Sequence, residues 1–368
     1  MVKVPKFFSV IPGFMTNTHE SVLRRLLLTY CSVADVADLL RIVHVAPAIQ
    51  GQSGGLHEVG QYDDERMVSR SVLAQALNLL LFRDLLTRVP TGNSYVSDCV
   101  AKGRQVFFDH GALRTVALAG MGELPAGEEA ITRVLLPLGY TLGALYPLDR
   151  LGMTGRSYTH SDFPEELPQF FVSELHPERF SPAFQAAVSR VTASSRDPLT
   201  AAAKEALHEL TAHRQLSFEK AREALPSLLA CFQRQHAAPL LEDYQALLAE
   251  SAEMAWIATE GNAFNHATDR VPSLEDVVED QRRLNRPVKD SIEVSRSGRV
   301  RQTAFHADRV ERDFVDSGGA VVKRTVPGSF FEFIQRERLH DPVTGSTRLD
   351  LAFDSRNAQG IFKMTAAA

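Results

Sequence analysis

The chain has 368 residues, of which 44% are hydrophobic and 23% charged, an ordinary globular composition with room for about two domains. Its 40 Lys and Arg against 45 Asp and Glu leave a net charge of −5, which gives no bulk argument for a nucleic-acid or anionic-membrane partner. We expect no membrane span and no signal peptide, because no sufficiently long apolar run and no apolar N-terminal core occur. Three widely spaced cysteines match no metal or redox motif, so we expect free thiols and a cytoplasmic protein.

Residues 1–104 are predicted to form a helical N-terminal region. Apolar residues recur with the helical period over residues 18–45 and 63–89. Residues 181–258 are predicted to be a second helical segment, since they include a strong helix-forming stretch at 201–210. The helices therefore precede and separate two segments of mixed character.

The two mixed segments, residues 105–180 and 259–368, each predict a βαβ-type module. In the first, a strand-like run through His110 leads into a helix over 127–138 and further strands. In the second, a strand candidate precedes a helix start at Ser273 that resembles a capping box. Further strand candidates follow at 291–294, 300–307 and 330–336. The chain thus predicts an α+β fold, and the sequence shows no strong residue-level repeat between the two modules.

The stretch from residue 329 to 336 places one carboxylate, Glu332, among the apolar and aromatic residues of a predicted strand. Burying a lone carboxylate is costly unless its charge is compensated, and a bound cation compensates it well. The alternative is an ion pair with Arg336 or Arg324. From this segment alone, the two explanations are equally supported.

Two histidines could complete a metal site with Glu332. His110 lies in the strand-like run Asp-His-Gly-Ala-Leu-Arg, and His266 lies in Gly-Asn-Ala-Phe-Asn-His-Ala-Thr. Two histidines and one carboxylate with open positions are typical of non-heme Fe(II) oxygen chemistry. Either histidine, taken alone, is explained more simply as a core or surface residue with satisfied hydrogen bonds.

Arg114 follows His110 by four residues, so on a strand both side chains point to one face, roughly 13 Å apart. A guanidinium suits carboxylate recognition because it donates two parallel hydrogen bonds. A metal at His110 and the side chain of Arg114 could therefore hold opposite ends of one small acid. The alternative, a salt bridge of Arg114, is favoured when this pair is considered alone.

The segments around His110 and Arg114, around His266, and around Glu332 together resemble the 2-oxoadipate dioxygenase/decarboxylase family. The fold of that family is related to the vicinal oxygen chelate proteins. Residues 331–336 are also similar to the metal-binding strand of 4-hydroxyphenylpyruvate dioxygenase, a more distant relative. The resemblance implies a vicinal-oxygen-chelate-like curved β-sheet built from βαβ-type modules.

The resemblance further implies that His110, His266 and Glu332 bind Fe(II) and that Arg114 holds a substrate carboxylate. The implied enzyme uses O2 to decarboxylate and hydroxylate a 2-oxo acid, as the family does in converting 2-oxoadipate to 2-hydroxyglutarate. Two alternatives stay open. One is a lyase, isomerase or hydrolase that uses a metal on the same fold, and the other is a non-catalytic ligand-binding protein.

One stretch departs from the family pattern. After Gly139 and Tyr140 the family has a sequence similar to Ser-Thr-Ala-Phe-Arg-Pro, and the corresponding residues 157–164 lack its arginine. His160 in this stretch could be a substitute polar contact, but we expect an exposed loop histidine. The departure bears on the substrate more than on the metal.

Overall fold

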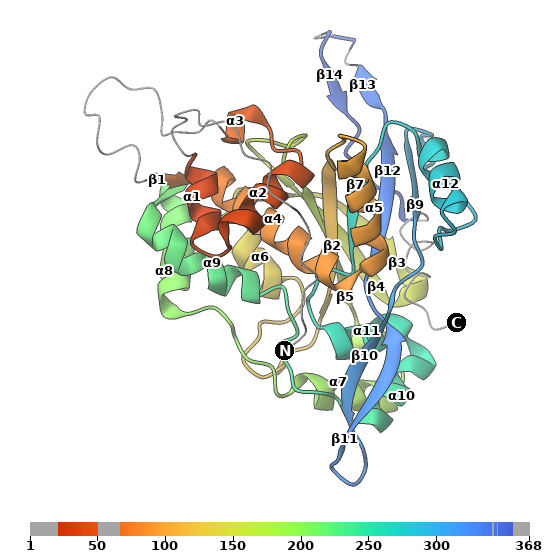
Figure 1. Ribbon diagram of the computed structural model, residues 1–368. Coiled ribbons are helices and arrows are strands. Elements are labelled where there is room, and N and C mark those ends of the chain that lie inside the picture. The colour runs from red at the N-terminus through yellow and green to blue at the C-terminus, as the bar shows by residue number, and fades with distance from the viewer. Residues whose placement is uncertain (1–20, 51–66, 341, 344, 356–368) are drawn as a thin grey trace.

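The structure, a computed structural model, describes residues 21–50, 67–340, 342–343 and 345–355. Its centre is a curved mixed sheet in the order β3-β4-β5-β2-β7-β12-β9-β8 (Figure 1). The strands of this sheet are β2 (Phe108–Val116), β3 (Tyr140–Leu148), β4 (Met153–His160), β5 (Gln169–Leu175), β7 (His266–Arg270), β8 (Glu293–Val294), β9 (Val300–Ala304) and β12 (Phe330–Arg336).

The sheet consists of two modules with the same order of elements. In the first, β2 is followed by α6 (Glu129–Leu135) and then by β3, β4 and β5. In the second, β7 is followed by α12 (Leu274–Arg283) and then by β8, β9 and β12, with a hairpin of β10 (Arg309–Val315) and β11 (Val321–Pro327) inserted before β12. In each module the first strand pairs in parallel with the last, and β2 and β7 join the modules by antiparallel pairing. The predicted α+β fold is confirmed.

Helices from the N-terminal and central parts of the chain pack around this sheet (Figure 1). The N-terminal helices are α1 (Val22–Leu28), α2 (Val33–Ile42), α3 (Pro47–Gln50), α4 (Arg70–Arg88) and α5 (Pro90–Ala101). The central helices are α7 (Pro182–Thr192), α8 (Ala201–His213), α9 (Phe218–Ala230), α10 (Leu241–Glu250) and α11 (Ala252–Glu260). Short strand pairs β1 (Met67–Ser69) with β6 (Gln215–Ser217), and β13 (Arg338–His340) with β14 (Thr347–Leu349), complete the fold.

The helices α4 and α5 cover one face of the sheet with aromatic contacts. The ring of Phe82 lies 5.0 Å from that of Phe108, and the ring of Tyr95 lies 4.7 Å from that of Phe333. Since side chains alternate along a strand, the neighbours of Phe333 on β12, including Glu332, point to the other face. The helix-covered face is therefore the main core, and the opposite face is free to carry polar chemistry.

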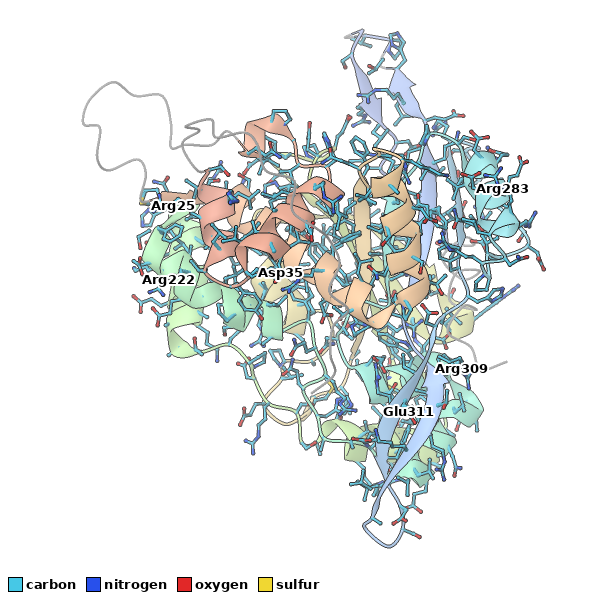
Figure 2. All side chains as sticks on the ribbon, viewed as in Figure 1. Arg25, Asp35, Arg222, Arg283, Arg309 and Glu311 are labelled. Carbon is cyan, nitrogen blue, oxygen red and sulfur yellow. The ribbon has the colours of Figure 1, made fainter. Side chains whose placement is uncertain are left out.

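Charged side chains labelled in Figure 2, such as Arg222 on α9 and Arg309 on β10, lie at the periphery of the molecule. Among the described residues, no helix combines the length and the apolarity that a membrane crossing requires.

The prediction that His160 lies in an exposed loop is wrong. The local sequence pattern does not predict β4, and His160 is the buried last residue of that strand. Its Nδ1 accepts hydrogen bonds from the backbone N–H groups of Asp162 and Phe163, and its ring packs edge-on against Tyr140. Burial lowers the pKa of His160 to about 4, so the ring is neutral at pH 7. The contacts of His160 are thus structural, within the first module.

Candidate metal centre

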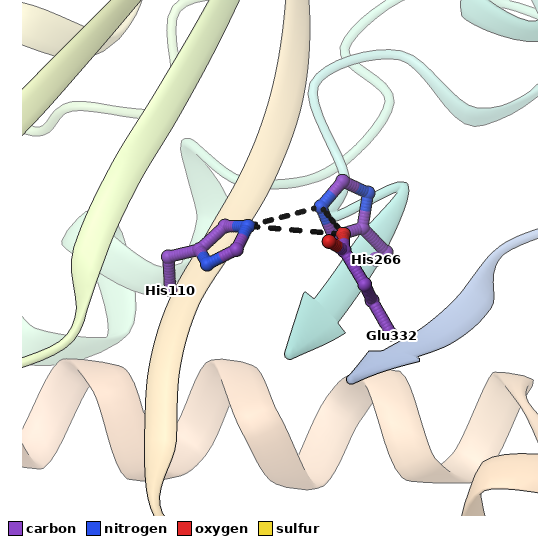
Figure 3. Close-up of side chains that lie close together, drawn as sticks. All are labelled: His110, His266 and Glu332. Carbon is purple, nitrogen blue, oxygen red and sulfur yellow. Dashed lines mark hydrogen bonds and ion pairs between the residues drawn. The ribbon is translucent and has the colours of Figure 1, made fainter. Parts of the chain in front are cut away.

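Neighbouring strands in the middle of the sheet bring His110, His266 and Glu332 together (Figure 3). His110 on β2 lies opposite Thr268 on β7, and Thr268 lies opposite Glu332 on β12. His266 precedes Thr268 by two residues, so its side chain points to the same face. The three side chains therefore converge on the face of the sheet that α4 and α5 do not cover.

The ligand atoms of these residues are close enough to share one ion. Nε2 of His266 lies 2.8 Å and Nε2 of His110 3.8 Å from Oε2 of Glu332, and the two Nε2 atoms are 3.4 Å apart. All three side chains are buried. Three such atoms within 4.8 Å of one another are the arrangement expected of a facial set of metal ligands.

Two buried atoms of the trio test whether a metal ion fits. Within the described part of the chain, neither Oε1 of Glu332 nor Nδ1 of His266 has a hydrogen-bond partner. A buried carboxylate oxygen without a partner is costly, and a bound cation offsets that cost. Burial lowers the pKa of His266 despite the opposing effect of Glu332, so the ring is held in the neutral form that binds metals. The residues therefore fit a divalent metal ion and leave some of its positions open.

Asp109 holds the ring of His110 from the other side. A β-bulge between Phe108 and His110 brings the carboxylate onto the same face as the imidazole, with Oδ1 2.9 Å from Nδ1. Burial acts to raise the pKa of Asp109, but Arg336 and His110 outweigh it and hold that pKa well below its usual range. Arg336 thus pairs with Asp109, and Glu332 pairs with His266, so the structure does not support Arg336 as the partner of Glu332.

The trio borders a small hollow, with about 390 Å³ of empty space when open solvent is included. Besides the trio, its described lining residues are Ala112, Phe171, Ser173, Asn265, Gln302, Phe353 and Asp354. The hollow therefore offers apolar side chains, neutral hydrogen-bonding groups and the carboxylate of Asp354 next to the trio.

Arg114 lies on the same face of β2 as His110, but it is not among the described residues that line the hollow. Its guanidinium stacks over the ring of Trp256, 4.8 Å from the centroid, and its neighbour across the strand pair is Ser173, which does line the hollow. Burial lowers the pKa of Arg114 to about 10, although Glu253 partly opposes this. The charge also contributes to lowering the pKa of His266. Arg114 thus lies just behind the residues that line the hollow, and its contact with a substrate stays a prediction.

Comparison with known proteins agrees with this site. The sequence profile of the 2-oxoadipate dioxygenase/decarboxylase family matches residues 83–363. The chain belongs to this family. Its members are enzymes, so the protein is an enzyme of the dioxygenase/decarboxylase class.

Individual proteins resemble the chain in sequence or in fold. The chloroplastic 2-oxoadipate dioxygenase/decarboxylase of Arabidopsis thaliana is 26% identical over 330 residues, which are 80% of this chain and 77% of that protein. A crystal structure described as a glyoxalase superfamily protein from Ralstonia eutropha JMP134 is 50% identical with a TM-score of 0.82, covering 90% of this chain and 98% of that one. Hydroxyglutarate synthase from Oryza sativa, solved with 2-oxoadipate, has a TM-score of 0.62 at 19% identity, covering 81% of this chain and 93% of that one, which shows a shared fold.

Proposed function

We propose that the protein is an Fe(II)-dependent oxygenase that decarboxylates and hydroxylates a 2-oxo acid such as 2-oxoadipate. The balanced reaction is R–CH2–CO–COO⁻ + O2 → R–CH(OH)–COO⁻ + CO2, in which both oxygen atoms enter the organic product. The observation that carries the proposal is the buried set of His110, His266 and Glu332 beside a hollow, in a chain of the dioxygenase/decarboxylase family.

The three ligands and the wall of the hollow have separate tasks in this proposal. His110 and His266 supply neutral ring nitrogens and Glu332 supplies a carboxylate oxygen, which suit Fe(II) with open positions. Fe(II), when bound, supplies the activation of O2 that the oxidation needs. Phe171 and Phe353 limit the access of water to the reacting atoms.

The substrate carboxylate needs polar partners and positive charge. Ser173, Asn265 and Gln302 offer neutral hydrogen-bonding groups on the wall of the hollow. The buried guanidinium of Arg114, directly across the strand pair from Ser173, adds a positive charge in a region of low dielectric. In this proposal Arg114 stabilises the carboxylate of the bound 2-oxo acid.

The test is O2 consumption by anaerobically Fe(II)-loaded protein with a panel of 2-oxo acids that includes 2-oxoadipate, with CO2 release followed in parallel. We expect one CO2 for each O2 consumed, and product analysis should show a 2-hydroxy acid one carbon shorter than the substrate. Iron bound at one equivalent without O2 uptake for any acid would contradict the oxygenase and favour a metal enzyme without redox chemistry on this fold.

A further inference from the structure

A network of charged and polar groups links the metal trio to a segment near the C-terminal end of the described chain. This segment, residues 350–353, is called the strap. Nε and Nη2 of Arg336 donate to the Asp109 carboxylate at 2.9–3.1 Å, while Nη1 donates to the backbone carbonyls of Asp350 and Ala352 at 2.9 and 2.8 Å. The guanidinium therefore binds the carboxylate that holds His110 and, at the same time, the backbone of the strap.

The strap in turn covers the trio. The ring of Phe353 lies edge-on to the ring of His110, with 4.8 Å between centroids, and the guanidinium of Arg336 lies 4.8 Å from the centroid of Phe353. The backbone N–H of Phe353 donates to the hydroxyl of Tyr146, 3.1 Å away. Phe353 also lines the hollow. The position of the strap and the shape of the hollow are thus fixed by the same contacts.

We propose that Asp109 and Arg336 are positioning residues that couple metal binding at His110 to the closure of the strap over the hollow. The proposal rests on the proposed metal centre. A metal-bound imidazole commonly donates its other N–H to a carboxylate, which fixes the ring orientation and strengthens the ligand. Asp109 is placed to accept that hydrogen from Nδ1 of His110, and Arg336 compensates the charge that this requires in the interior.

Arginine is needed at position 336 for a geometric reason. Its planar fork reaches one carboxylate and two carbonyl oxygens in different directions, whereas lysine offers a single point of charge. Arg336→Lys should therefore keep the charge beside Asp109 but release the strap. Asp109→Asn should remove the charge that holds both His110 and Arg336.

The experiment measures the Kd for Fe(II) under anaerobic conditions and the visible absorption of the Co(II)-substituted protein. We expect Asp109→Asn and Arg336→Lys each to raise the Kd by about 10–100-fold and to change the Co(II) spectrum. The matched control is Arg133→Lys, which disrupts an Arg–carboxylate pair with Asp197 of similar geometry, at 2.7 and 3.0 Å. This control should lower the melting temperature but leave the Kd and the spectrum unchanged.

Amide hydrogen exchange of the strap provides the second readout. Fe(II) should slow amide exchange at Ala352 and Phe353 in the wild-type protein and should not slow it in Arg336→Lys. The Arg336→Lys variant also tests the proposal if Asp109→Asn does not fold. The coupling would be overturned if the variants bound Fe(II) with a Kd within twofold of the wild-type value. It would also be overturned if Fe(II) did not change the amide exchange rate of the strap in the wild-type protein. If the wild-type protein bound no Fe(II), the proposed metal centre itself would fail, which is a distinguishable result.

Discussion

The two modules of the sheet share one scaffold but give the metal site different residues. When His110 is aligned with His266, the alignment extends along both strands, because an arginine follows each histidine by four residues. These arginines are Arg114 and Arg270. The order of elements after these strands is also the same, as described above. The modules are thus repeats in which particular positions have diverged.

The divergence that matters most lies on the last strand of each module. Ala112 on β2 lies opposite Phe171 on β5, and in the matched positions Thr268 on β7 lies opposite Glu332 on β12. The first module therefore places an aromatic ring where the second places a carboxylate, and both side chains line the hollow. A fully symmetric pair of modules would surround an ion with four ligands. With Phe171 in place of a second carboxylate, the three proposed ligands would leave one side of a bound ion open, as a catalytic metal site requires.

The support of the two histidines differs as well. Asp109 contacts Nδ1 of His110, but its counterpart is Asn265. Oδ1 of Asn265 and Nδ1 of His266 are both buried, and neither has a hydrogen-bond partner among the described residues. The first module therefore holds Nδ1 of its histidine with a carboxylate, whereas among the described residues the second module contacts its histidine at Nε2, through Glu332, and leaves Nδ1 without a hydrogen-bond partner.

The largest effect is expected from removing the carboxylate that only the second module provides. Glu332→Gln keeps the size of the side chain but loses the charge that balances a cation, so Fe(II) binding should weaken by more than the roughly 10–100-fold typical of residues that merely support a ligand. O2 uptake should be lost with it. Metal titration and oxygen-electrode assays check this, with exposed Glu337→Gln as the control. Unchanged iron content would refute the ligand assignment.

Giving both modules a carboxylate at the matched position should also stop turnover, but by strengthening metal binding and not by weakening it. Phe171→Glu places a second carboxylate in the matched position, so we expect tighter binding of Fe(II) and a rate as low as that of Glu332→Gln. The control Phe171→Leu keeps the position apolar and should retain both iron and activity. Binding and rate are measured separately, and wild-type turnover in Phe171→Glu would show that this position does not reach the ion.

Giving the histidine of the second module a neighbouring carboxylate, as in the first module, should have a smaller effect. It should strengthen metal binding but lower the stability of the metal-free protein. Asn265→Asp offers His266 a carboxylate, so the Kd for Fe(II) should fall by up to about tenfold. The metal-free protein should become less stable, because no arginine accompanies the added charge as Arg336 accompanies Asp109. Thermal melts with and without Fe(II) measure both changes, and equal shifts in the two states would contradict the matching of the modules.

The last effect does not involve the metal, concerns the first module alone and depends on pH. The pKa of His160 is lowered to about 4 in the folded protein, so between pH 6.5 and 4 the unfolded chain binds a proton that the folded chain does not. The free energy of unfolding should therefore fall as the pH drops through this window, with His160 accounting for roughly 2 kcal/mol at pH 5. Denaturant titrations at pH 7 and pH 5 test this. In His160→Asn the decrease should be smaller by that amount, and an identical pH dependence would refute the role of His160.

The sequence predicts the three residues that converge in the fold better than the residues around them. His110, His266 and Glu332 can be predicted as a set because a metal needs these residue types and the family pattern supplies their combination, and the structure brings the three together. Asp109 is missed because strict alternation on a strand places it on the face opposite His110, and only the bulge reverses this. A bulge leaves no clear mark in the sequence here.

Other features escape sequence analysis for similar physical reasons. The strand β4 contains Gly155 and polar residues, so its burial depends on partners on both sides that the local sequence does not reveal. The repeat of the modules is visible in the sequence only as two histidines each followed by an arginine, and it becomes clear once the strand register aligns Phe171 with Glu332. Local sequence patterns identify elements, whereas register and bulges depend on the whole sheet.

The order of the ligands along the chain has a consequence for how the protein matures. His110 belongs to the first module and Glu332 to the last strand of the second, with the central helices between them. The three residues of the site are therefore far apart in the sequence. The chain must close long loops before these residues can hold an ion. A chain still being synthesised and shorter than β12 would lack a complete site. Binding of a metal ion by the proposed site would then follow folding, and a bound ion would mark chains whose two modules have joined correctly.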